Sequence, residues 1–437
     1  MGNDAKRRRT EAPPEDAPVR LSDDMITEIL LRLSARSVLR FRAVCRAWLR
    51  VTTDPRFLAA HARLRPPEVV LYTYLDAPHD GNRPLGYAVD IALDAVPVSA
   101  TDGDRASRRR RLIRYPKFVA LSDPPERWYL DMPIHCLLLA ACDGVLLFKK
   151  DEGFYLLCNP ATRRWAELPR LARLDFADVD IERAFYFHRP SGEYRLLCRR
   201  GRSTPAGGTR WLILSTGAAE PRRVDTLAGA AMAPPCLLTT GTTPVPFRDH
   251  LHWPPRRGLS AGSEASPTMM VAFDTLSETF HLMAGPPTAS STLVKLFAMV
   301  GTLAAADFGE ERHVDLWFLE GDYGAGRWER RHQVATPWGS GYWGGISSEN
   351  RSLLYVAAAG DGDHGDVLLG TPHCLLVHNV RRRKTVRTVT SAAVPDLARS
   401  ESSVAVSRHV FRESLEQHPA FSEWPSSAGR FPLLHDW

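Results

Sequence analysis

A hairpin layout that recurs along the chain is the feature that most constrains its fold. Each copy has an apolar strand, then an Asn or Asp, and a second strand that opens six residues later. The three clear copies are Tyr155–Leu168, Met270–Met283 and Leu375–Thr388, with Asn159, Asp274 and Asn379 at the turns and Trp165, Phe280 and Thr385 beyond them. Asn and Asp favour such turns because their side chains bond to nearby backbone groups, and Pro160 presets the backbone in the first copy.

The spacing of these copies predicts a β-propeller. Two looser copies follow the strands Thr209–Ser215 and Val314–Glu320. The marker residues Cys158, Leu214, Phe273, Phe318 and His378 are separated by 56, 59, 45 and 60 residues. A period of about 50 residues with about four strands per unit suits a propeller, in which each small sheet buries its faces against its neighbours. Val69–Pro133 holds strand-like sequence for one more unit, so we expect a mainly β domain with about six irregular blades.

The 437 residues exceed what one compact core holds, and we divide the chain into four parts. Residues 1–20, which are charged and rich in proline, are expected to be a disordered leader. Residues 21–65 are expected to be a small helical docking domain, and residues 66–391 the propeller-like domain. Residues 392–437 are assigned to a C-terminal extension.

The stretch Leu21–Leu49 has the periodicity of short helices. Met25, Ile26, Ile29, Leu30 and Leu33 fall on one stripe of a helix that Ser22 caps and that the acidic pair Asp23–Asp24 favours through the helix dipole. The apolar residues that predict two further short helices are Val38, Leu39 and Phe41, then Val44, Cys45, Trp48 and Leu49. Val51–Pro67 is expected to be a helical bridge to the next domain. Three helices this short bury little apolar surface, so part of the stripe should face a partner.

These residues resemble an F-box. The resemblance rests on Leu21, Asp24, Glu28–Leu30, Arg32–Leu33, Ser37–Phe41, Val44–Arg46 and Trp48, and it departs from the family at Ser22 and Ser34, where proline is usual. An F-box docks a Skp-type adaptor and through it a cullin–RING ubiquitin ligase. The resemblance therefore implies adaptor-binding roles for Leu21, Met25, Ile29, Leu30, Leu33, Val38, Leu39, Val44, Cys45 and Trp48. About half of such apolar positions are expected to close the small helical core instead, and the sequence does not sort them.

A second resemblance covers most of residues 68–390. The motifs are Cys142–Phe148, Cys158–Pro169, His188–Leu197, His250–Trp253, Ala272–Phe280 and Val314–Arg331, and in this order they look like the F-box-associated domain common in plant F-box proteins. The chain has no Trp–Asp dipeptide, and Gly–Gly pairs occur only at 207–208 and 344–345, so it departs from the WD40 and kelch patterns.

Two other readings of the basic residues carry less support. Arg42, Arg46 and Arg50 at fourfold spacing could line a DNA-reading helix, but no candidate recognition helix begins with clustered Asn, Gln or Arg, and we expect no nucleic-acid partner. The net charge of +6 comes from the runs Lys6–Arg9 and Arg108–Arg111, which predict solvated loop charge, with nuclear import through the first run as an alternative.

The catalytic and metal-binding motifs in the sequence lack the flanking elements, ligands or spacing that such sites need. Gly258–Gly262 spells GxSxG and Gly339–Gly344 spells GxGxxG, but no strand leads into either motif and no helix follows. Asp361, Asp363 and Asp366 lack the glutamate of a calcium loop, since Pro372 stands in its place. His135, Cys136 and Cys142 do not have the usual zinc spacing. We expect no catalytic residue, cofactor or metal.

The cysteines indicate a reducing compartment. Seven cysteines, an odd number without a CxxC pair, lie mostly in apolar runs, which is typical of reduced, buried thiols. The first 20 residues have no apolar core of a secretory signal, and the longest uncharged apolar run, Leu296–Ala306, is too short to span a bilayer. We expect a cytoplasmic or nuclear protein with no membrane partner.

Together these features predict a non-enzymatic substrate receptor, a subunit that docks a ligase adaptor and presents an unknown target protein for ubiquitination. The alternatives are a propeller enzyme acting on carbohydrate, which needs paired carboxylates at one end of the propeller, and an adaptor-bound scaffold without ubiquitination. For target contact we select the Gly-rich loop Thr336–Gly345 with Trp338, Tyr342 and Trp343. The competing reading makes Trp343 the start of a strand that packs between blades and continues to Val356.

Overall fold

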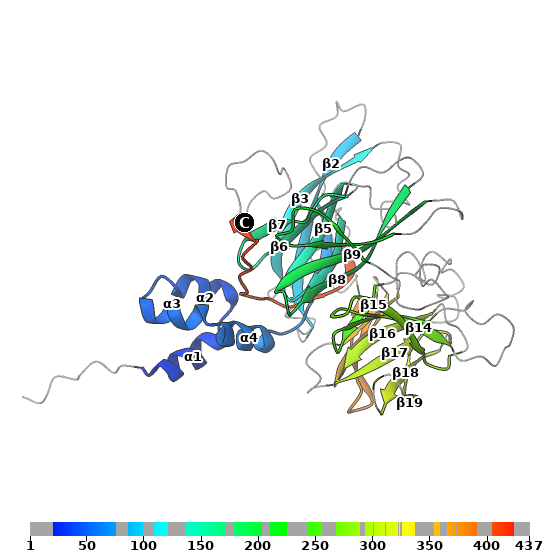
Figure 1. Ribbon diagram of the computed structural model, residues 1–437. Coiled ribbons are helices and arrows are strands. Elements are labelled where there is room, and N and C mark those ends of the chain that lie inside the picture. Colours follow the sequence, from blue (N-terminus) through cyan, green and yellow to red (C-terminus); the bar gives the residue numbers. More distant parts are fainter. Residues whose placement is uncertain are drawn as a thin grey trace, which may run out of the picture. The chain divides into compact units, whose positions relative to one another are not determined.

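A computed structural model describes most of the chain, which divides into two compact units, Met1–Leu64 and Arg65–Trp437. The described residues are 21–75, 86–98, 109–120, 137–151, 153–171, 178–202, 210–224, 243–255, 268–288, 293–299, 301–310, 312–321, 323, 326–336, 354–358, 365–371, 374–390 and 404–423. Figure 1 shows the helices of the first unit and the strands of the second.

The described part of the first unit holds four helices, which are α1 (Asp23–Leu31), α2 (Ala35–Phe41), α3 (Arg46–Thr53) and α4 (Pro55–Leu64). The Ser22 hydroxyl accepts a hydrogen bond from the Met25 amide at 3.3 Å and caps α1, as predicted. Ser34 caps α2 in the same way, through the Ser37 amide at 3.4 Å. The expected bridge is split between α3 and α4 at Asp54, because Pro55 suits only the first position of a new helix.

Six antiparallel sheets make up the described part of the second unit, and we call them blades 1 to 6. Blade 1 contains β24 (Val404–Phe411), β1 (Glu68–Leu75), β2 (Gly86–Pro97) and β3 (Arg110–Ala120). Blade 2 contains β4 (Leu137–Cys142), β5 (Val145–Asp151), β6 (Phe154–Asn159), β7 (Arg164–Glu167) and β25 (Ser422–Glu423). Blade 3 contains β8 (Asp178–His188), β9 (Glu193–Arg202), β10 (Arg210–Ser215) and β11 (Arg222–Val224). Blade 4 contains β12 (Val245–Phe247), β13 (His250–Trp253), β14 (Met269–Asp274) and β15 (Thr279–Ala284). Blade 5 contains β16 (Val294–Met299), β17 (Thr302–Asp307), β18 (His313–Glu320) and β19 (Arg327–Ala335), and blade 6 contains β20 (Tyr355–Ala358), β21 (Asp366–Thr371), β22 (Cys374–Asn379) and β23 (Lys384–Thr390).

The blades close into a ring because every neighbouring pair shares an apolar cluster. Six clusters join blades 1 and 2, 2 and 3, 3 and 4, 4 and 5, 5 and 6, and 6 and 1. Strand alternation decides which neighbour each residue meets. In β1, Val69 and Leu71 pack in the cluster shared with blade 6, while Val70 between them packs in the cluster shared with blade 2. The predicted six-bladed, propeller-like β arrangement is confirmed.

The repeated hairpin is the outer hairpin of the blade. The clear copies are β6–β7, β14–β15 and β22–β23, and the looser ones are β10–β11 and β18–β19. The predicted turn chemistry is present in the clear copies, where the side chains of Asn159, Asp274 and Asn379 accept hydrogen bonds from the amides of Ala161 (3.0 Å), Leu276 (2.8 Å) and Arg382 (2.7 Å). Four positions after each of these residues the backbone has a positive φ, at Arg163, Glu278 and Arg383.

The assignment of residues 392–437 to an extension is wrong for residues 404–423. β24 pairs with β1 as a strand of blade 1, and β25 pairs with β7 of blade 2. The link between them also docks on the propeller. Asn159 Nδ2 donates to the Ser414 carbonyl (3.1 Å), and a Cβ on Gly144 would lie 2.5 Å from the Ser414 Cβ. Among the described strands, β24 has no hairpin partner nearby in the sequence, so no local pattern marks it as a blade strand.

We predict that the second unit needs its C-terminal strands. A fragment of residues 65–391 lacks β24 and β25, which exposes the edge of β1 and removes Phe411 from its cluster, so it should not melt cooperatively. A fragment of residues 65–423 keeps both strands and should give one sharp calorimetric transition. Equal, cooperative melting of the two fragments would contradict this closure of the ring.

Candidate functional site

The helical unit has a small core that accounts for part of the predicted adaptor-binding set. Leu30 and Val38 are fully buried, so these two predicted contacts belong to the core instead. Phe57 and His61 of α4 are buried as well. The rings of Phe57 and His61 stack at 5.9 Å, and the His61 Nε2 donates to the Leu33 carbonyl at 2.9 Å, which ties α4 to the end of α1. The apolar stripe on α1 is thus only partly buried within the unit.

The other edge of the stripe faces outward. Leu21, Met25 and Ile29 follow one another at fourfold spacing and are 43%, 53% and 45% exposed. Val44 and Cys45, between α2 and α3, are also exposed. We call these five residues the docking surface. Exposed apolar side chains gathered in so short a segment are characteristic of protein contact sites.

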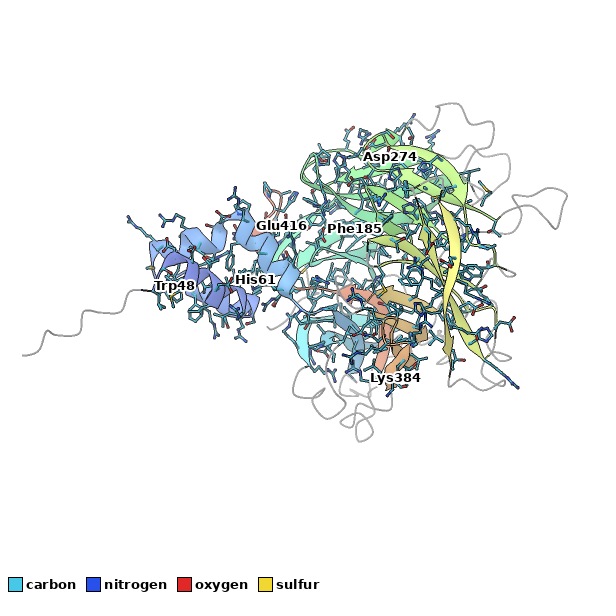
Figure 2. The ribbon with its side chains drawn as sticks, turned by 90° about the horizontal axis from the view of Figure 1, so that it is seen from below. Trp48, His61, Phe185, Asp274, Lys384 and Glu416 are labelled. Carbon is cyan, nitrogen blue, oxygen red and sulfur yellow. The ribbon has the colours of Figure 1, made fainter. Side chains whose placement is uncertain are left out.

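The remaining predicted residues lie at the border of the core. Leu33, Leu39 and Trp48 are half-buried, and the Trp48 ring meets the Phe41 ring edge-on at 5.3 Å. Figure 2 shows Trp48 on the helical unit, with its side chain drawn. Leu49 is exposed as well and was not selected from the sequence. The sequence could have indicated Leu49, because it lies four residues after Cys45 and residues four apart share a helix face.

The helical unit is strongly basic. Residues 21–64 contain eight arginines, no lysine and four carboxylates. Two of the carboxylates are in exposed pairs, Glu28 with Arg32 at 2.6 Å and Asp23 with Arg50 at 3.6 Å. The four carboxylates offset four of the eight arginines, so residues 21–64 keep an excess of four positive charges. A partner with an acidic surface fits this excess.

The predicted target contacts Trp338, Tyr342 and Trp343 lie outside the described residues. So do the GxSxG and GxGxxG motifs and the metal candidates His135, Cys136, Asp361 and Asp363. Across the described ranges, no three His, Cys, Asp or Glu side chains are grouped as metal ligands. Asp366 instead accepts a hydrogen bond from Asn379 Nδ2 at 2.6 Å. No helix in the described part of the chain has the length and apolar character needed to cross a membrane.

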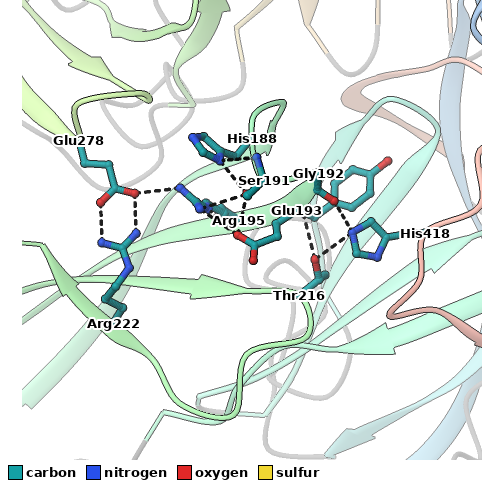
Figure 3. A network of polar contacts seen from close by, with 10 residues as sticks. His188, Ser191, Gly192, Glu193, Arg195, Thr216, Arg222, Glu278 and His418 are labelled. Carbon is teal, nitrogen blue, oxygen red and sulfur yellow. Dashed lines mark hydrogen bonds and ion pairs between the residues drawn. The ribbon is translucent and has the colours of Figure 1, made fainter.

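A Ser–His–Glu cluster at the β8–β9 turn needs to be compared with a catalytic triad. Ser191 Oγ lies 2.7 Å from His188 Nδ1 and donates to Glu193 Oε2 at 2.8 Å (Figure 3). In a triad the carboxylate orients the imidazole, but here it binds the serine itself. Burial, and next the positive charge of Arg195, lower the pKa of His188. The cluster therefore lacks the arrangement that activates a serine nucleophile.

The same cluster continues into an ion network between blades 3 and 4. Arg195 Nη1 reaches Glu278 Oε1 at 2.9 Å, and Arg222 binds both oxygens of Glu278 at 2.5 Å (Figure 3). Arg195 also donates to Glu193 at 2.8 Å, so one guanidinium holds two carboxylates. Arg195 and Arg222 come from blade 3 and Glu278 from a turn of blade 4, which gives the network a structural role at the blade interface.

Comparison with known proteins finds a family model that matches within the first unit and relatives that match over longer stretches. Residues 19–59 match the family model described as the F-box domain. An F-box protein of Arabidopsis thaliana is 26% identical over 188 residues, which cover 41% of this chain and 38% of that protein. A second F-box protein of Arabidopsis thaliana is 24% identical over 148 residues, covering 34% and 32%. The chain therefore spans about a third of the length of these relatives. A hypothetical selenium-binding protein from Sulfolobus tokodaii aligns over 76% of each chain at 12% identity and a TM-score of 0.33, a likeness too low to carry an argument.

The division of the stripe into core and surface can be tested by two neighbouring substitutions. Leu30→Ala leaves a cavity in the helical core and should destabilise that unit by about 2–5 kcal/mol. Ile29→Ala removes an exposed side chain and should cost less than about 0.5 kcal/mol. Thermal melting of the full chain, followed by its helical circular dichroism, compares the two variants. Similar losses in both would place Ile29 in the core.

Proposed function

The chain carries an F-box domain at residues 19–59, and on that premise we propose that it is a substrate-recognition subunit of a Skp–cullin–F-box ubiquitin ligase. The docking surface binds a Skp-type adaptor, and the propeller-like unit captures a target protein. The observation that carries the proposal is the docking surface itself. Met25 and Ile29 stay exposed beside a core that is already closed by Leu30 and Val38. A folded unit gains nothing from exposing these side chains unless a partner covers them.

The composition of the docking surface fits this role. Apolar side chains supply area that is removed from water on binding, and the surrounding arginines attract an acidic partner and speed its association. Adaptor binding should therefore weaken as salt is added. The Skp-type adaptor and the cullin–RING ligase that it brings act in the cytoplasm or the nucleus, in agreement with the reduced cysteines expected from the sequence.

A non-enzymatic role is favoured over a carbohydrate-processing one by how the carboxylates are held. Glycoside hydrolysis needs one carboxylic acid and one free carboxylate facing a substrate. Glu68 and Glu413 instead share Arg110, at 2.5 and 3.1 Å, and Glu193 and Glu278 share Arg195. A guanidinium fixed between two carboxylates binds both of them and keeps them from facing a substrate as a free acid and base pair. In these two pairs the charge is used to hold strands and turns together.

Adaptor binding is tested by Ile29→Asp in the full chain. A carboxylate at this position would be buried without a partner in the complex, so we expect the dissociation constant for a purified Skp-type adaptor to rise at least thirtyfold, about 2 kcal/mol. Leu282→Asp is the matched control, because Leu282 is a similarly exposed leucine on β15 of the propeller. It should bind the adaptor normally. Unchanged binding by Ile29→Asp, or equal loss in both variants, would refute the docking surface.

Target modification is a separate question from adaptor docking. Proteins captured with the full chain from cells should become more abundant when the proteasome is inhibited, and the Ile29→Asp variant should abolish this increase while it still captures them. Targets whose amounts do not respond to the inhibitor would instead support the scaffold role.

A further inference from the structure

A cavity of about 670 Å³ opens among blades 4, 5 and 6, and no role described so far uses it. Its walls come from the β12–β13, β16–β17 and β22–β23 turns, from the end of β18 and from the middle of β19. These turns join first to second or third to fourth strands, so in antiparallel sheets they all lie at the same end of the propeller. The volume falls within the range of sites that enclose a ligand, about 300–1,000 Å³.

The charge of the cavity is positive. Arg248, Arg331 and Arg381 line it, and Glu320 is the one carboxylate among the lining residues. Glu320 is already engaged by Arg331 in an ion pair. The guanidinium of Arg248 lies 5.3 Å from the centre of the Phe247 ring, and no carboxylate in the described part of the chain forms an ion pair with it. An anion that enters the cavity would therefore meet more positive than negative charge.

Arg248 is held in a conformation that its residue type disfavours. Arg248 and Asp249 form the two-residue turn between Phe247 and His250, with φ values of 49° and 59°. Asn–Gly is the pair that such a turn prefers, because a left-handed backbone is costly for long side chains. The turn is nevertheless well fixed, since the His250 Nδ1 donates to the Arg248 carbonyl at 2.7 Å. An arginine kept at a strained position beside a cavity suggests that its side chain is needed there.

Apolar groups surround the arginines. Phe247, Phe318 and Val380 line the cavity together with Tyr323, whose hydroxyl is fixed by His252 Nε2 at 2.5 Å. Arg381 packs the carbons of its side chain against Gly365, where an added Cβ would lie 3.0 Å from Arg381 Cγ. The cavity thus combines rigid aromatic surfaces with guanidinium groups, which bind carboxylates and phosphates through two parallel hydrogen bonds.

We propose that this cavity binds an acidic peptide segment of the target, in which a carboxylate or a phosphate next to an apolar side chain contacts Arg248 and Arg381. The inference rests on the proposed receptor role for the origin of the peptide. The cavity and the docking surface share no residue, and they lie on different units of the chain.

The test uses the full chain and an array of random octapeptides in three forms, with Asp and Glu present, with both replaced by Asn and Gln, and with both replaced by phosphoserine. The wild-type chain should retain acidic or phosphorylated peptides that also carry an apolar residue, and the neutral array should be retained at least tenfold less. The comparison of the acidic and the phosphorylated arrays shows which anion is preferred. Equal retention of the neutral array, or no retained peptide in any array, would overturn the proposal.

A double variant, Arg248→Asn with Arg381→Gln, locates the binding. Asn tolerates the left-handed turn and Gln keeps part of the stem on Gly365, so the melting temperature should stay the same or rise while acidic peptides bind ten- to a hundredfold more weakly. The matched control, Arg210→Asn with Arg223→Gln, removes the same charge from exposed positions of blade 3 and should bind as the wild type does. If both double variants bound acidic peptides equally weakly, the loss would be explained by net charge alone and the site would be refuted. Adaptor capture by the same preparations reports on the receptor role independently.

Discussion

The propeller depends on the antiparallel pairing of β24 with β1, which joins the two ends of the second unit. In this ladder Glu68 lies opposite Phe411 and Thr73 lies opposite Val404, with a bulge in between where the Ser407 hydroxyl accepts a hydrogen bond from the His409 amide at 2.9 Å. Without β24 the ring would have an open sheet edge at β1, and the clusters on both faces of blade 1 would lose a wall. Arg110 reinforces the junction by pairing with both Glu68 and Glu413. Burial raises the pKa of Glu68, an effect that Arg110 opposes.

The sequence predicted the parts of this fold that local chemistry decides. Asn159, Asp274 and Asn379 marked the outer hairpins because an Asx side chain satisfies the amides of its own turn, and Ser22 and Ser34 marked the helix starts for the same kind of reason. What the sequence could not predict is non-local. β24 pairs with β1, more than 300 residues upstream, and no turn residue in the sequence indicates this pairing. The sorting of Leu30 from Ile29 also needed the tertiary packing of the helices, in which His61 of α4 bonds to the Leu33 carbonyl just beyond α1.

The candidate sites also divide into one that local sequence indicates and one that depends on non-local packing. The five exposed residues of the docking surface were all selected from the sequence, because they lie in one short segment whose helical spacing shows which residues can lie together, and their role in adaptor binding stays a prediction. The cavity at the end of the propeller was not foreseen, since Arg248, Arg331 and Arg381 come from three blades and lie around one space only when blades 4, 5 and 6 pack side by side. Closure of the ring completes the core of blade 1. The packing of blade 4 on blade 5 and of blade 5 on blade 6 brings their turns around one space.

Native-state hydrogen exchange of the full chain tests the closure most directly. If β24 is an integral strand of the ring, the amides of residues 404–411 and of β1 should exchange only through global unfolding of the second unit, with the same opening free energy as the inner strands β16 and β20. Opening of β24 at a free energy several kcal/mol lower than that of β16 would contradict the account, because it would describe a peripheral tail on a propeller that is closed without it.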